Sequence, residues 1–117
     1  MNKNPYDYLR HDFLGDADPI DARASWRITE AKDETITILT ALTPEGMWCY
    51  GYHVYWRNGR TSAEKPCASR GLFTSQREAR LHAIGFFLTF APYFTPSSCE
   101  DLRAAEKKLA QSSFFED

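Results

Sequence analysis

The sequence predicts an α+β fold in a single domain, residues 1–117: an antiparallel three- to four-stranded sheet, one long buried helix packed on it, and flanking N- and C-terminal helices. Alternating apolar and polar residues in the first half of the chain are typical of strands that bury one face. A helix start signal at Ser75 then precedes a stretch of apolar residues with helical period. A length of 117 residues fits one domain with its own core.

The first elements follow from local signals in chain order. A helix is expected from Asn4, a favourable N-cap followed by a proline, to Gly15, a common stop. Strands are expected at 24–30 and 35–38, where apolar or β-branched residues alternate with polar ones. The residues between these strands, with Glu34 at their end, are expected to form a polar turn.

A third strand and a hairpin come next. The strand is expected at 47–57, with Gly51 marking a bulge or the close approach of a helix. It ends at Asn58-Gly59, which favours a type I′ hairpin because both residues tolerate positive φ. The return strand, about 60–65, is polar and reaches a proline, so it is expected to be short and at the sheet edge.

Two helices complete the predicted fold. Ser75 and Glu78 form a capping box, and the helix after it runs from about 76 to 91. Its apolar arc is wide, which implies burial on more than one side. A last helix begins at Ser97 and has a narrow apolar stripe, so it lies on the surface of the core.

Composition excludes several classes of protein. The longest apolar run falls far short of the roughly 20 residues that a membrane helix needs. The N-terminus shows no apolar segment of a secretory signal. Three cysteines, Cys49, Cys67 and Cys99, without such a signal favour reduced thiols. We therefore expect a cytoplasmic protein without a membrane partner.

Neither a metal, a cofactor nor an enzymatic motif is indicated. Cys49 and His53 are four residues apart, but in a strand that spacing is about 13 Å, too far for one zinc ion. A dyad of His82 with Cys67 or Cys99 stays open, although no spacing supports it. The sequence contains no Gly-x-Ser-x-Gly and no phosphate-binding glycine loop. It therefore favours a binding protein over an enzyme.

The strand at 47–57 holds five of the nine Trp and Tyr residues of the chain. Its even positions are expected to pack under the Phe-rich helix, as part of the core. Its odd positions carry His53, Tyr55 and Arg57, a ring system beside cations, which suits nucleic acid if neither the first nor the last helix covers that face. The residues predicted to bind DNA or RNA are His53, Tyr55, Arg57, Arg60, Lys65, Arg70, Arg77 and Arg80.

The charge distribution agrees with this hypothesis. Residues 47–96 carry six Lys and Arg against two Glu, whereas both flanking segments are net acidic. Arg77 and Arg80 lie three residues apart near a helix N-terminus, which attracts anions. The alternative is that these charges only solvate an edge strand and a helix turn.

The run Gly-Leu-Phe-Thr-Ser-Gln-Arg-Glu-Ala-Arg after a Trp-containing strand resembles a junction in two DNA-binding families. These are the ethylene-response-factor and integrase-arm types, three-stranded sheets packed on a helix, and the resemblance covers about 47–91. In such domains the sheet enters the DNA major groove. The element order over about 4–91 is also similar to a double-stranded-RNA-binding fold. The resemblance implies nucleic-acid contacts for four cations: Arg57, Arg60, Arg77 and Arg80.

A second class of function stays open. The protein is then a protein-binding adaptor or inhibitor, or a homodimeric protein of a mobile element, without nucleic-acid contact. Aromatic residues near the end of the chain supply the contacts in that case, since exposed aromatic side chains are frequent interface anchors. The residues predicted for protein binding are Tyr93, Phe94, Phe114 and Phe115.

Overall fold

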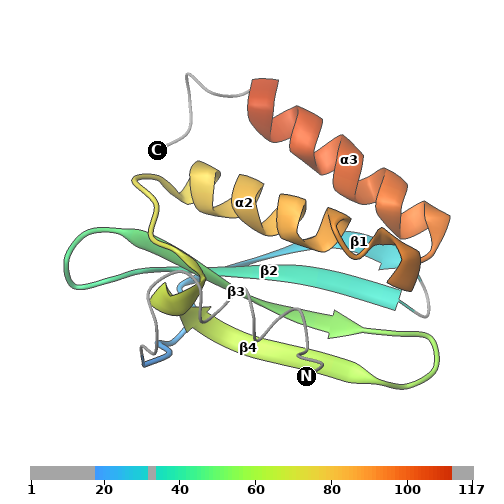
Figure 1. Cartoon of the computed structure of the whole chain (residues 1–117), viewed down its shortest axis with the longest axis horizontal. Coiled ribbons are helices and arrows are strands. Elements are labelled where there is room, and N and C mark those ends of the chain that lie inside the picture. The colour runs from blue at the N-terminus through green and yellow to red at the C-terminus, as the bar shows by residue number, and fades with distance from the viewer. Residues whose placement is uncertain (1–17, 32–33, 112–117) are drawn as a thin grey trace, which may run out of the picture.

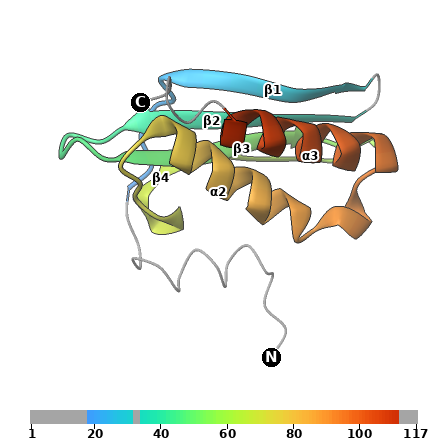
Figure 2. The same ribbon diagram turned by 90° about the horizontal axis from the view of Figure 1, so that it is seen from above.

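The computed structural model describes residues 18–31 and 34–111. Four strands form one antiparallel sheet in the order β1-β2-β3-β4, and two helices lie side by side on one of its faces (Figures 1 and 2). This confirms the predicted α+β class, while the helix expected from Asn4 lies outside the described residues. The elements are β1 (Ala24–Ala31), β2 (Glu34–Leu42), β3 (Trp48–Tyr55), β4 (Thr61–Cys67), η1 (Ala68–Arg70), α2 (Gln76–Leu88), η2 (Ala91–Tyr93) and α3 (Pro96–Gln111).

The core lies between the sheet and the helices. Because side chains alternate along a strand, the even positions of β2 and β3 point at α2, and Ile38, Tyr52 and Val54 are buried there. Phe87 of α2 meets the Tyr52 ring edge-on at 5.4 Å between centroids. The predicted packing of the even face of the aromatic strand is thus confirmed for its central residues, and Trp48 at its start is half-buried.

The start of α2 follows the predicted signal. The Ser75 hydroxyl accepts the Glu78 N–H at 3.1 Å. The helix ends at Leu88 instead of 91, because Pro92 cannot continue a helical hydrogen-bond ladder and the chain turns into η2. Thr89 closes α2, with its N–H donating to the carbonyl oxygens of the last turn.

Glu34 takes a role that the sequence did not predict. Instead of lying in a polar turn, it begins β2 and is buried. Its Oε1 accepts hydrogen bonds from the Thr95 N–H at 3.0 Å, the Thr95 hydroxyl at 2.9 Å and the Ser98 hydroxyl at 2.5 Å. Thr95 in turn caps α3, since its hydroxyl accepts the Ser98 N–H. One carboxylate therefore fixes the start of α3 to the sheet.

The β3–β4 hairpin differs from the prediction. Asn58 does not have positive φ, so the type I′ turn is wrong; only Gly59, at φ 88°, is left-handed. The Trp56 N–H and the Arg60 carbonyl close the loop at 2.9 Å. A three-residue loop ending in a left-handed glycine is the alternative hairpin that suits such a sequence.

Gly51 marks a bulge where β3 and β4 lose register. A Cβ built on Gly51 would meet the Glu64 carbonyl oxygen and lie 2.5 Å from the Pro66 nitrogen, both backbone atoms that cannot move aside easily. Gly51→Ala is therefore expected to lower the free energy of unfolding by about 1–3 kcal/mol, measured by urea denaturation. Gly85→Ala in α2 is the matched control, because its Cβ meets nothing and should stabilise the helix by up to about 1 kcal/mol.

Candidate functional site

The candidate site is the sheet face turned away from α2 and α3, called here the open face (Figure 1). Directly paired residues of antiparallel strands point to the same side, so the register places the odd residues of β2 and β3 in rows on this face. Two neighbouring rows each cross all four strands. The first row is Arg27, Thr37, His53 and Ala63; the second is Glu30, Thr35, Tyr55 and Thr61.

Only one half of the open face is accessible. His53 is exposed and the Tyr55 side chain is 39% exposed. Towards the β2–β3 turn, Ala41 and Cys49 are buried. Whether the odd positions of β3 are exposed was left open by the sequence, and in the structure they are exposed only in the second half of the strand.

The described start of the chain is tied to the closed half of the face. The Ile20 N–H donates to the Pro66 carbonyl at 2.9 Å, and the Arg23 N–H donates to the Thr40 carbonyl at 2.8 Å. Burial raises the pKa of the Cys49 thiol in this half to about 11, with a smaller contribution from Cys67. A protonated, buried thiol is a structural group and not a nucleophile.

Cations surround the accessible half. Arg57 and Arg60 are exposed in the hairpin that follows β3, and Arg60 N–H donates to Asn58 Oδ1 at 2.9 Å. Lys65 also lies on this side and forms a salt bridge of 2.9 Å with Asp21. The hydrogen bond from Lys65, followed by its charge, holds the pKa of Asp21 below its ordinary value. Both side chains are exposed, so this contact is weak and does not remove Lys65 from the surface.

Arg27 is a cation of this face that the sequence analysis did not select. It is exposed, and its pairing with Thr37, which pairs with His53, puts it in the same row as His53. The alternation of apolar and polar residues around Trp26 predicts that Arg27 points to the face opposite Trp26. Only the strand pairing shows that it belongs beside His53, and that pairing is not visible in the sequence.

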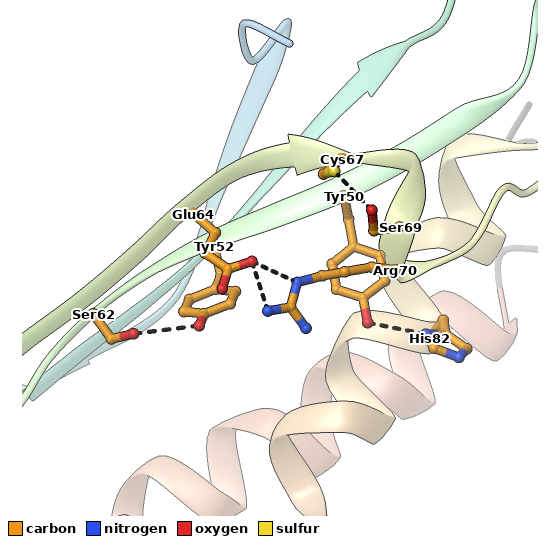
Figure 3. A network of polar contacts seen from close by, with 8 residues as sticks. All are labelled: Tyr50, Tyr52, Ser62, Glu64, Cys67, Ser69, Arg70 and His82. Atoms are coloured by element: carbon orange, nitrogen blue, oxygen red, sulfur yellow. Dashed lines mark hydrogen bonds and ion pairs between the residues drawn. The ribbon is translucent and has the colours of Figure 1, made fainter. Parts of the chain in front are cut away.

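Arg70 does not belong to the surface, and its predicted role in nucleic-acid binding is wrong. Its side chain is 2% exposed, and Nε and Nη2 both donate to Glu64 Oε1, at 2.9 and 2.6 Å (Figure 3). The guanidinium lies 5.2 Å from the Tyr52 ring centroid and 5.0 Å from that of Phe86. Arg70 is therefore a buried cation held by an ion pair and two rings.

Arg77 and Arg80 lie apart from the other predicted cations. They belong to the first half of α2, in the helix layer, whereas the β3–β4 hairpin is at the other end of the sheet (Figure 1). α2 starts at the end of the sheet far from the β3–β4 hairpin, because Phe73, just before α2, pairs with Trp48, the first residue of β3. The Arg80 guanidinium lies 5.1 Å from the Trp26 ring centroid, on the helix side. The predicted residues therefore do not form one surface.

The side chains of the possible Cys–His dyad, His82 with Cys67 or Cys99, form hydrogen bonds with other residues. His82 Nδ1 is 3.0 Å from the Tyr50 hydroxyl, and burial lowers the pKa of His82 while it raises that of Tyr50 (Figure 3). The Cys67 thiol donates to Ser69 Oγ at 3.4 Å, and the Cys99 thiol to the Ala91 carbonyl at 3.6 Å. In these hydrogen bonds His82 is joined to Tyr50, Cys67 to Ser69 and Cys99 to Ala91.

In residues 18–31 and 34–111, no three His, Cys, Asp or Glu side chains come together as a metal site would require. None of the helices in the same part of the chain has the length and apolar character to cross a membrane.

Of the four aromatic residues predicted to bind a protein, one is exposed, one is buried and two lie outside the described residues. Tyr93 in η2 is 70% exposed. Phe94 is buried and stacks on Trp56 at 5.9 Å between centroids, so its predicted surface role is wrong. Phe114 and Phe115 lie outside the described residues.

Comparison with known proteins adds no assignment. No family model matches the chain, and no significant match is found among curated proteins or solved structures. The resemblance to DNA-binding domains over 47–91 therefore stays a prediction. The geometry of the open face and the charges around it carry the functional proposal.

Proposed function

We propose that this chain is a small non-enzymatic binding protein that holds nucleic acid on the accessible half of its open face. One observation carries the proposal: His53 and Tyr55 are exposed side by side on the face opposite the helices, between Arg27 and the hairpin cations. Rings supply stacking surface for bases, and cations supply attraction for phosphates.

The distribution of exposed charge supports a polyanionic ligand. Among residues 18–29 and 34–67, the exposed charged side chains are five cations and three anions, Asp18, Asp21 and Glu45. The cations are Arg23, Arg27, Arg57, Arg60 and Lys65. On α3, by contrast, three cations balance three anions. The surplus positive charge thus lies on the sheet and its hairpin, and long-range attraction would steer an anion there.

The three cysteines support a cytoplasmic location. Cys49, Cys67 and Cys99 are buried thiols, and none of them is in a disulfide. Free thiols are usual in a reducing compartment, where disulfides do not persist. We therefore propose the cytoplasm as the place where the protein works.

Charge removal on the open face tests the proposal. Binding of a fluorescein-labelled oligothymidylate of about 12 nucleotides is followed by anisotropy for the wild type and for Arg27→Gln combined with Arg60→Gln. Each lost phosphate contact should weaken binding about 5-fold at about 0.1 M salt, so the double variant should lose about 25-fold. The matched control is Arg103→Gln with Lys107→Gln, which removes the same charge from α3. Equal losses in both doubles, or no binding by the wild type, contradict the proposal.

A protein partner is the second candidate function, and Tyr93 favours it. Its side chain is the most exposed large hydrophobic one among the described residues. If η2 is a contact surface between two copies of the chain, light scattering should show a dimer that Tyr93→Ala dissociates. If the wild type is a monomer at micromolar concentration, the homodimer hypothesis is wrong.

A further inference from the structure

We infer that the nucleic acid is single-stranded and runs along β3, with one base stacked on His53 and the next on Tyr55. This inference rests on the proposed function of the open face and names the class of its ligand. It departs from the resemblance to DNA-binding domains, which implies insertion of the sheet into the major groove of a duplex.

The two rings are placed as a stacking pair. His53 and Tyr55 are two residues apart on one strand, so they point to the same side with a spacing of roughly 6.6 Å. Side chains of a strand stand nearly perpendicular to the sheet. The rings therefore project from the open face at two neighbouring positions along β3.

The neighbours of the two rings are short. Thr37 and Ala63 flank His53 in its row across the sheet. Thr35 and Thr61 flank Tyr55 in the next row. These side chains reach only one or two atoms beyond Cα, so the strands directly beside β3 place no long side chain next to either ring. Arg27 and Glu30 belong to the same two rows but lie on β1, one strand further away. Gly51, the residue before His53 on the same face, adds no side chain either. An unstacked base can reach each ring face.

The width of the sheet argues against a duplex. Four strands spaced about 4.8 Å apart span about 14 Å between the outer strand axes, before side chains are counted. The major groove of B-DNA is about 12 Å wide and takes a helix or a two-stranded ribbon. The major groove of an RNA duplex is narrower still. In both duplexes the base faces are stacked on one another, so the rings of His53 and Tyr55 would have nothing to contact.

The cations define where the strand can run. β3 leads directly into the hairpin that carries Arg57 and Arg60, so phosphates beyond the Tyr55 position meet positive charge. Arg27 lies two strands to the side in the row of His53. The buried half of the face, around Cys49, bounds the path at the other end. The accessible surface thus fits a short stretch of one strand.

The test compares the binding of single-stranded and duplex probes, and the binding of the wild type with that of variants that lack one of the two rings. Anisotropy is measured with oligothymidylate, oligouridylate and the matching duplex, each about 12 units long. The wild type should bind the single strands at least about 10-fold more tightly than the duplex. His53→Ala and Tyr55→Ala should each weaken single-strand binding by about 5- to 150-fold, the range of a lost base stack. Tyr55→Phe keeps the ring and should bind within about 2-fold of the wild type.

The control and the contrary outcomes separate the two proposals. Leu72→Ala removes an exposed apolar side chain from the segment between η1 and α2 and should leave binding unchanged. If the duplex binds as tightly as the single strands and Tyr55→Ala has no effect, the nucleic-acid function stands and the single-strand inference is overturned. If no probe binds, the proposed function itself fails. Circular dichroism of each variant verifies the fold, and a loss in Tyr55→Phe equal to that in Tyr55→Ala rules out stacking.

Discussion

Arg70→Met is expected to lower the free energy of unfolding by about 3 kcal/mol, the lower end of the cost of breaking a buried ion pair. Methionine has a similar length and fills the space between the Tyr52 and Phe86 rings. It removes both hydrogen bonds to Glu64, whose carboxylate then faces the core without its cation. The Glu64 side chain is 25% exposed, so water can reach it and limit the loss.

The partner residue provides a sharper check of this prediction. Adding Glu64→Gln to Arg70→Met removes the uncompensated charge and should recover part of the stability, because a buried pair costs most when only one member is lost. Arg60→Met is the exposed control and should change stability by no more than about 0.5 kcal/mol. Urea denaturation measures all three variants. A loss below about 1 kcal/mol in Arg70→Met would show that the network contributes little.

Glu34→Ala is expected to cost about 3 kcal/mol. Hydrogen bonds to a charged group contribute about 1.5–3 kcal/mol each, but their energies do not add fully when they share one oxygen. The variant leaves the Thr95 N–H and two hydroxyls at the start of α3 without their acceptor. It also removes a negative charge from a helix N-terminus, where such charge is stabilising.

The Glu34 prediction has a local readout as well as a global one. Hydrogen exchange should accelerate first in the opening turn of α3, and the Ser98 amide should report it. Glu34→Gln keeps an oxygen acceptor without the charge and should fall between wild type and alanine. Glu106→Ala on the exposed side of α3 is the control. Unchanged exchange at Ser98 in Glu34→Ala contradicts the anchoring role.

The features that were predicted correctly from the sequence are those that depend on local residue patterns. The two-residue period of β3 placed Tyr52 in the core and His53 on the other face, because alternation does not depend on tertiary structure. The Ser75 cap was also predictable, since its hydrogen bond spans three residues. Asn58-Gly59 indicated the right position for a hairpin but the wrong turn type.

The features that were missed depend on distant partners. In the sequence Glu34 has the pattern of a turn residue, because its hydrogen-bond partner Thr95 is 61 positions later in the chain. Arg70 looks like one more surface cation, because its contact with Glu64 depends on which face of β4 meets the helices. Arg57 and Arg77 belong to one basic segment of the sequence, yet α2 starts at the end of the sheet opposite the β3–β4 hairpin (Figure 1). Sequence period cannot supply these relations, since strand pairing and helix direction are properties of the whole fold.

The salt dependence of oligothymidylate binding tests the central claim, that the open face holds nucleic acid by phosphate contacts, most directly. For the wild type, log K should fall linearly as log salt rises between about 50 and 200 mM, by about 0.7 per phosphate contact on a single strand. Arg27→Gln with Arg60→Gln should reduce the steepness by about 1.4, whereas Arg103→Gln with Lys107→Gln should leave it unchanged. A flat response in the wild type, or the same slope in all three proteins, would contradict the assignment of nucleic-acid binding to the open face.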